Sequence, residues 1–265
     1  MNNAVTNFDE ILRQAHDYGL PQEKKRAILR EYLQTKILSL IYQETVSKNL
    51  YFIGGTALRI LRGLNRFSED LDFDSVGTTP DQIRELIKTI VHRLDQENIA
   101  VELYQNTTPK KYYYELRFPR LLAELKLGSV TGEKLMIKLD IENFWRGQKR
   151  EMLFVNRYGL LATVVTNPLD QILVEKLAAY LGRKETQARD LYDLVWLLAK
   201  GIKTDNKFAL KNNLTADLLE KALKKFNQEK KNLPILKNKL KPFLFDEKKV
   251  SSVNFFENLV KNSGK

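Results

Sequence analysis

Aspartates at alternate positions are the residues of this sequence best suited to phosphate chemistry. Asp70, Asp72 and Asp74 alternate with Leu71 and Phe73. Side chains two positions apart on a β-strand point to the same side, so the pattern predicts a strand with its carboxylates on one face. Two such carboxylates can share divalent cations with a triphosphate. We therefore take Asp70 and Asp72 as candidate catalytic metal ligands, with a solvated strand face as the simpler alternative.

A glycine pair precedes these aspartates, at the end of a short apolar run. Residues 50–53 predict a buried strand, which Gly54 and Gly55 end. Thr56 then begins a helical segment. A turn of this kind presents backbone N–H groups to an anion, and glycine lets the backbone approach closely. We thus predict that nucleotide phosphates bind to Gly54, Gly55 and Thr56. The alternative is a simple strand-to-helix turn, which would explain one glycine more readily than two.

A third carboxylate is expected from a second alternating segment, residues 134–142. Its apolar positions are Leu135, Ile137, Leu139 and Ile141, and its other face carries Met136, Lys138, Asp140 and Glu142. We predict Asp140 as the third metal ligand, with Glu142 as the alternative on the same face. A plain strand edge would give the same pattern.

The order of these features resembles the polymerase-β-type nucleotidyltransferase signature, Gly-Gly or Gly-Ser followed by Asp-x-Asp. The longer string, Gly-Gly-Thr-Ala-Leu-Arg from Gly54 and then Arg-Phe-Ser-Glu-Asp-Leu-Asp-Phe from Arg66, looks like the AbiEii/AbiGii toxin family. Members of that family are the toxin halves of bacterial toxin–antitoxin systems, several of them linked to phage defence by abortive infection. An ordered combination of this length is specific, whereas either motif alone is not.

The resemblance also assigns residues beyond the pattern itself. It implies an aspartate after a hydrophobic residue at Asp140, and it places Ser68 near the phosphates, although Ser68 also suits a local turn. The family pattern ends before Asp74, which we leave out of the site.

A second string is similar to the family's C-terminal motif, a lysine on one helix and Arg/Lys-Asp-x-x-Asp at the start of the next. Lys176 and the run Arg189-Asp190-Leu-Tyr-Asp193 occupy these positions. The resemblance implies that Lys176 reaches the nucleotide phosphates and that Asp190 acts as a base or orienter, supported by Arg189 and Asp193. Stabilisation of a helix start is the structural alternative.

The implied function is that of a toxin that transfers NMP from an NTP to an acceptor, with the tRNA 3′ end as the first expectation. Two Mg²⁺ ions held by Asp70, Asp72 and Asp140 would bind the triphosphate, and translation and growth would stop. The resemblance also implies an antitoxin on a separate chain. The alternatives are a nucleotidyltransferase acting on a small molecule or a protein, and a non-catalytic nucleotide- or RNA-binding protein.

Composition excludes several classes of site. The chain of 265 residues has no cysteine, so a disulfide framework and a thiolate zinc site are impossible. No apolar run approaches the length of a membrane span and the first residues lack a signal-peptide pattern, so we predict a cytoplasmic protein without a membrane partner. Of the net charge of +11, much falls in residues 200–265, which hold 16 lysines, no arginine and 7 acidic residues. Such lysines can bind the phosphates of an RNA backbone, or they can simply lie on solvent-exposed helix faces.

The elements predict an α+β fold. Helices are expected over 7–17, 22–47 and 80–96. Strands are expected over 99–105, 112–118 and 134–142, with edge strands at 151–155 and 161–166. Together the strands should form a mixed, mostly antiparallel sheet of the polymerase-β type. Helices then follow over 168–182, 186–200, 215–228, 232–242 and 252–262. We therefore divide the chain into a nucleotidyltransferase domain with N-terminal helices, 1–166, and a helical, lysine-rich domain, 167–265.

Overall fold

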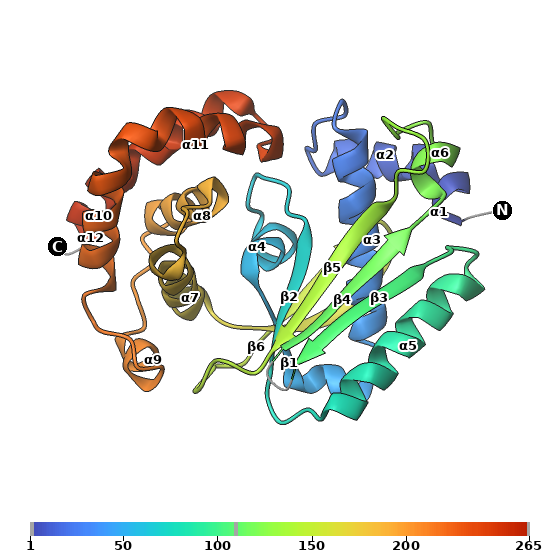
Figure 1. The fold of residues 1–265 in the computed structure, drawn as a ribbon, viewed down its shortest axis with the longest axis horizontal. Helices are drawn as coiled ribbons and strands as arrows, with labels where there is room; N and C mark the ends of the chain where they lie inside the picture. The colour runs from blue at the N-terminus through green and yellow to red at the C-terminus, as the bar shows by residue number, and fades with distance from the viewer. Residues whose placement is uncertain (1–2, 109–110, 264–265) are drawn as a thin grey trace. The chain divides into compact units, whose positions relative to one another are not determined.

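The computed structural model describes residues 3–108 and 111–263 (Figure 1). They form two compact units whose segments alternate along the chain, here named the sheet unit and the helical unit. The sheet unit comprises Met1–Leu61, Phe67–Phe144 and Met152–Thr166, and the helical unit comprises Arg62–Arg66, Trp145–Glu151 and Asn167–Lys265. The division of the chain at residue 167 stays a prediction.

A five-stranded sheet is the centre of the sheet unit. Its strands, in spatial order, are β1 (Leu50–Ile53), β2 (Asp70–Ser75), β5 (Leu135–Glu142), β4 (Lys111–Phe118) and β3 (Glu102–Thr108). The β2–β5 pair is parallel, and the other pairs are antiparallel. The predicted α+β class with a mixed, mostly antiparallel sheet is confirmed.

One face of this sheet is buried because its side chains are apolar at every second position. Leu71 of β2, Leu139 of β5 and Leu116 of β4 are 0% exposed. The long helix α3 (Lys25–Ile41) passes behind the sheet in Figure 1, and α5 (Pro80–Gln96) contributes a further buried stripe from Ile83 to Leu94. This unit also contains the shorter elements α1 (Asn3–Thr6), α2 (Phe8–Asp17), η1 (Thr45–Asn49) and α6 (Leu121–Glu124).

The helix predicted over 22–47 is shorter than expected. It begins at Lys25 and ends at Ile41, and the hydroxyl of the next residue, Tyr42, donates to the carbonyls of Leu50 and Val165. The chain then continues as the 3₁₀ helix η1 into β1.

The last two strands were predicted to add edges to the large sheet, and this prediction is wrong. Instead β6 (Glu151–Arg157) and β7 (Leu160–Thr166) pair with each other as a separate two-stranded sheet. The residues between them, Tyr158 and Gly159, have φ of +55° and +69°. Left-handed backbone at both central residues is what a tight hairpin turn requires, so β6 and β7 pair with each other as a hairpin.

A buried ion-pair group connects α3 to α4 (Gly54–Arg62), the helix that follows the glycine pair. Glu31 of α3 accepts from Arg59 of α4 at 2.8 Å and from Arg157 of β6 at 2.8 Å. Glu31 and Arg59 are only 2% and 3% exposed. Burial, together with the nearby Arg59 charge, lowers the pKa of Arg157. The group therefore fixes α4, and with it the turn at the start of this helix.

The helical unit consists mainly of α-helices and short 3₁₀ segments. They are α7 (Leu169–Gly182), α8 (Ala188–Ala199), α9 (Asn206–Lys211), α10 (Leu218–Glu229), η2 (Lys230–Asn232), α11 (Leu233–Leu240), η3 (Lys241–Phe243), η4 (Glu247–Phe255) and α12 (Phe256–Ser263). In its core the Phe256 ring packs in a tilted arrangement against the rings of Tyr180 and Phe226, at centroid separations of 6.1 Å and 5.1 Å. No helix within the described part of the chain has the length and apolar character needed to cross a membrane.

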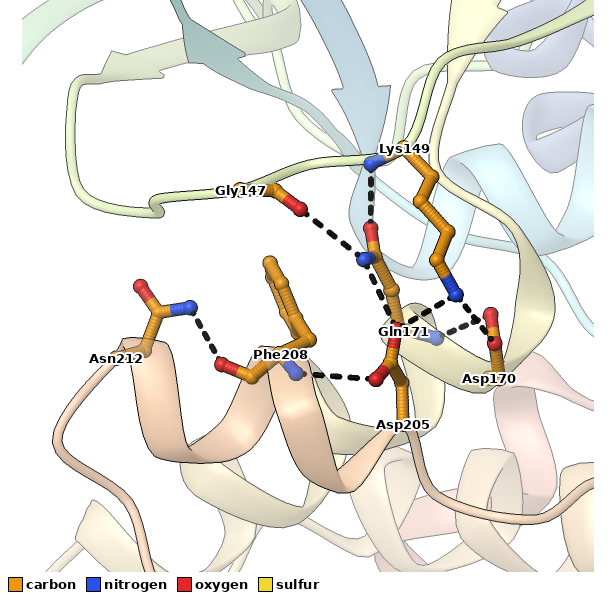
Figure 2. A network of polar contacts seen from close by, with 7 residues as sticks. All are labelled: Gly147, Lys149, Asp170, Gln171, Asp205, Phe208 and Asn212. Carbon is orange, nitrogen blue, oxygen red and sulfur yellow. Dashed lines mark hydrogen bonds and ion pairs between the residues drawn. The ribbon is translucent and has the colours of Figure 1, made fainter.

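The segment 145–151 is fastened to α7 and α9 by a polar network (Figure 2). Gln171 accepts from the Lys149 N–H at 2.8 Å and donates to Asp205 at 3.2 Å, while the Lys149 ammonium lies 2.8 Å from Asp205. Burial would raise the pKa of Asp205, but Lys149 and the N–H of Phe208 lower it to about 2. This carboxylate therefore stays charged and binds the segment at all ordinary pH values.

The buried group around Glu31 yields a stability prediction. We expect Glu31→Ala to lower the free energy of unfolding by about 3–5 kcal/mol, because Arg59 and Arg157 then lose their buried counter-charge. Urea denaturation measures this, with Glu10→Ala as the control. Glu10 pairs with Arg13 on the surface, with 47% of its side chain exposed, so its loss should cost far less stability than the loss of Glu31. Equal effects from both variants would contradict the anchoring role.

Candidate active site

Gly54 lies against the carboxylate of Asp72. Its backbone is left-handed, with φ of +78°, where β1 turns into α4. A Cβ at this position would lie 2.9 Å from Cγ of Asp72, closer than side-chain carbons approach each other. Glycine is therefore required both by the backbone conformation and by the aspartate. The structure thus places the glycine turn directly beside Asp72, one of the three predicted metal ligands.

Gly55 and Thr56 follow in the first turn of α4 and are buried. The Thr56 hydroxyl donates to the backbone carbonyl of Asp70, which ties the helix start to the start of β2. Because the hydroxyl is used in this way, a phosphate would be bound by backbone N–H groups of the turn, where the helix dipole also favours an anion. The binding of phosphates by Gly54, Gly55 and Thr56 stays a prediction.

Ser68 lies in the partly exposed segment before β2. Its carbonyl accepts a hydrogen bond from the Gln34 side chain of α3 at 3.2 Å. This contact fixes the backbone of the segment, and the role of the Ser68 hydroxyl near a phosphate stays a prediction.

The predicted metal ligands share one face of the sheet. In the parallel β2–β5 pair, Asp72 is opposite Asp140, and Asp70 is opposite Lys138. Paired residues on neighbouring strands point to the same side, with the strands about 4.8 Å apart. Asp70, Asp72 and Asp140 are all partly exposed. The fold therefore brings together three carboxylates that are separated by up to 70 residues in the sequence.

A lysine also contacts the third carboxylate. The Lys111 ammonium of β4 lies 2.8 Å from Oδ1 of Asp140 and 2.8 Å from Oε1 of Glu142. Partial burial would lower the pKa of Lys111, but these two carboxylates raise it well above its usual value. Lys111 thus places a positive charge at the carboxylates, and its contact with both keeps Glu142 as the alternative ligand.

The carboxylate group fits a divalent cation in its chemistry. Within residues 3–108 and 111–263, no three Asp, Glu or His side chains are already gathered around one metal position. Carboxylate oxygens are nevertheless the ligands that Mg²⁺ prefers, and Asp70, Asp72 and Asp140 present them from one face.

Asp74 differs from the other aspartates on its strand. It is 1% exposed and accepts a hydrogen bond from the Phe144 N–H at 2.9 Å. Asp74 therefore holds the chain after β5, which agrees with leaving it out of the predicted site.

Lys176 and Asp190 belong to a buried charge cluster in the helical unit. The Lys176 ammonium lies 2.8 Å from Asp193 and 3.9 Å from Asp190, and Arg183 lies 2.7 Å from Asp190. Arg66 donates two hydrogen bonds of 2.7 Å to Asp193. Burial would raise the pKa of Asp193, but Arg66 and Lys176 hold it below its usual value. Arg189 lies instead over the ring of Phe243, at 4.4 Å.

Sequence reasoning missed two residues here. Arg66 was quoted as part of the first string, and the structure shows that it pairs with Asp193 of the second string. A buried arginine in a motif needs a carboxylate partner, so Asp193, which was given only a supporting role beside Asp190, was the available signal. Lys111 gave no signal, because only the strand register, which sets it opposite Glu142, brings its ammonium to Asp140.

The glycine turn yields a prediction that separates backbone strain from the position of Asp72. Gly54→Ala and Gly63→Ala both force alanine into left-handed backbone, at φ of +78° and +76°, and each should cost about 1–2 kcal/mol of stability. Only at Gly54 does the new Cβ meet the Asp72 carboxylate; at Gly63 nothing lies within 4 Å. We therefore expect Gly54→Ala alone to weaken Mn²⁺ binding, measured by calorimetry. Equal Mn²⁺ affinity in both variants would show that Asp72 is free to move aside.

Known proteins resemble this chain in sequence or in fold. The family model described as nucleotidyl transferase AbiEii toxin, type IV toxin–antitoxin system, matches residues 36–260, and none of the curated proteins matches the chain. The crystal structure of JHP933 from Helicobacter pylori is 20% identical, covers 90% of this chain and 91% of its own, and has a TM-score of 0.55. MenT4, a nucleotidyltransferase toxin from Mycobacterium tuberculosis, is 19% identical, covers 96% and 98%, and has a TM-score of 0.52.

At these identities the two structures show a shared fold, whereas the family model spans most of the chain. The glycine turn and the aspartate strand both fall inside the matched region. The protein belongs to the AbiEii nucleotidyltransferase toxin family of type IV toxin–antitoxin systems.

Proposed function

We propose that this toxin transfers a nucleoside monophosphate from an NTP to an acceptor hydroxyl, with the 3′ end of tRNA as the first candidate acceptor. The observation that carries the proposal is the placement of the Gly54 turn against Asp72, with Asp140 opposite Asp72 on the next strand. A phosphate-binding turn and carboxylates at one position are the parts that nucleotide transfer needs.

Each group has a definite task in this reaction. The acceptor oxygen forms a bond to the α-phosphorus, the bond from that phosphorus to the bridging oxygen breaks, and pyrophosphate leaves. The backbone N–H groups at the start of α4 bind the leaving phosphates, and the proton of the hydroxyl passes to a neighbouring carboxylate. Mg²⁺, when bound by Asp70, Asp72 and Asp140, supplies charge neutralisation for the triphosphate.

The charge of the protein supports a polyanionic acceptor. The net charge is +11, and most of the excess lies in residues 200–265. Part of this charge is used internally, because Lys225 donates to the carbonyls of Tyr180 and Arg183, and Lys230 pairs with Glu257. The remaining lysines favour RNA over a small molecule as the acceptor. Under this proposal the protein is a cytoplasmic toxin that blocks translation and is neutralised by the antitoxin of its system.

The test is incubation of the protein with bulk tRNA, Mg²⁺ and each α-labelled NTP in turn. We expect label on RNA with the wild type, and a loss of at least about 10²- to 10³-fold with Asp72→Ala. Because Asp72 is partly exposed, the melting temperature of the Asp72→Ala variant should differ little from that of the wild type. Label on the protein or on a small molecule instead would identify a different acceptor class.

Asp74→Ala is the matched control on the same strand face. It leaves the Phe144 N–H without its acceptor, so it should lower the free energy of unfolding by about 1–3 kcal/mol while the folded fraction keeps its turnover. Full transfer activity in Asp72→Ala would remove the carboxylate strand from the mechanism.

Lys176 and Asp190 are proposed to act on the reaction because of their place in the family motif. Lys176 would offset the charge that develops on the leaving pyrophosphate, an effect confined to the transition state. Its removal leaves Asp193 paired with Arg66, so the helical unit keeps its central ion pair.

We therefore expect Lys176→Met to lower turnover by about 10²- to 10³-fold with a small change in melting temperature, and Asp190→Asn to act in the same direction. Arg183→Met is the control, since it removes another cation of the cluster whose side chain is 49% exposed, and its turnover should stay near that of the wild type. A Lys176→Met protein that is less stable but keeps its specific activity would make Lys176 structural only.

A further inference from the structure

The carboxylate face of the sheet continues across β4 and β3. Tyr113 of β4 is opposite Asp140, and Asn106 of β3 is opposite Tyr113. Further along the same face, Tyr104 of β3 is opposite Glu115. This side of the sheet therefore carries carboxylates at β2 and β5 and aromatic and amide side chains at β4 and β3. We call the second half the aromatic half, consisting of Tyr104, Asn106, Tyr113, Glu115 and Arg117.

The aromatic half is open and internally organised. Every residue of β3 is exposed, and Tyr104 is 44% exposed. The Arg117 guanidinium lies over the Tyr104 ring at 4.9 Å and donates to Glu115 at 2.8 Å. Tyr113 also donates to Glu115. These contacts hold the two tyrosines and the arginine in fixed positions, so a planar ligand would meet a prearranged surface.

The strand order determines which substrate would meet this surface. The glycine turn that binds the leaving pyrophosphate follows β1, at the opposite edge of the sheet from β3. In phosphoryl transfer the attacking and leaving oxygens lie roughly in line with the phosphorus between them. The acceptor must therefore approach from the side away from β1, across β5 towards β4 and β3.

We propose that the aromatic half docks the accepting end of a single RNA strand, with its terminal base stacked on the Tyr104–Arg117 pair. Exposed aromatic rings and guanidinium planes are the groups on which unpaired bases stack. Lys138, which lies opposite Glu115 on the same face, adds positive charge for the phosphates of the strand. This inference rests on the proposed function, since it assigns the acceptor position of the same site.

The test uses a fluorescein-labelled single-stranded oligoribonucleotide with a free 3′ hydroxyl, without NTP. We expect Tyr104→Ala to weaken its binding, measured by fluorescence anisotropy, by about 5- to 150-fold, the range for the loss of one base–aromatic stack. Tyr104→Phe keeps the ring and should bind as the wild type does. In turnover assays Tyr104→Ala should raise KM for the acceptor and leave KM for the NTP unchanged.

Leu103→Ala is the matched control, because Leu103 is adjacent on the same strand, is 39% exposed and points to the other face. The affinity of this variant for the oligoribonucleotide should equal that of the wild type. The inference is overturned if Tyr104→Ala binds the oligoribonucleotide normally, if it weakens NTP binding instead, or if the wild type has no affinity for the strand. Failure of the proposed function is distinct, because it appears as the absence of labelled product with every NTP and every acceptor.

Discussion

The close approach of the Asp72 carboxylate to the Gly54 backbone is the constraint on which the site depends. It requires β1 and β2 to pair in the register that sets Ile53 opposite Asp72, and it requires α4 to start directly after β1. The Thr56–Asp70 hydrogen bond and the Glu31–Arg59 pair then hold that helix in place. The helix start would attract the proposed phosphate, whereas the Asp72 carboxylate would repel it, so the proposed binding mode requires a cation to offset the negative charges.

The two motif strings have a physical reason to occur together. Arg66 of the first string forms a buried bidentate pair with Asp193 of the second, and the two side chains are 2% and 0% exposed. Breaking such a pair leaves an uncompensated buried charge, so the partners must be retained or lost together. Asp193 is therefore a structural residue of its motif, and the pair ties residues 62–66, which lie between α4 and β2, to α8.

Strongly periodic segments made much of the fold predictable from the sequence. The alternation around Asp70 and Asp140 and the apolar stripe of α5 each formed the expected element, because burial of one face leaves no other solution. The separate β6–β7 hairpin was not predicted, since its turn depends on Tyr158 in left-handed backbone, which its residue type does not announce. The position of Lys111 beside Asp140 could not be predicted from local pattern, because strand order and register decide it.

The exposed face of the sheet departs from what stability alone would favour. Asp70, Asp72, Asp140 and Glu142 crowd like charges onto neighbouring strands, which destabilises a sheet unless cations intervene. Lys111 supplies one such charge, at 2.8 Å from two of the carboxylates. Local conflicts of this kind are expected where a protein gives up stability for function. The aromatic half has no such repulsion, because Glu115 is matched by Arg117. One face thus combines an electrostatically strained half suited to metal and phosphate with a neutral half suited to a base.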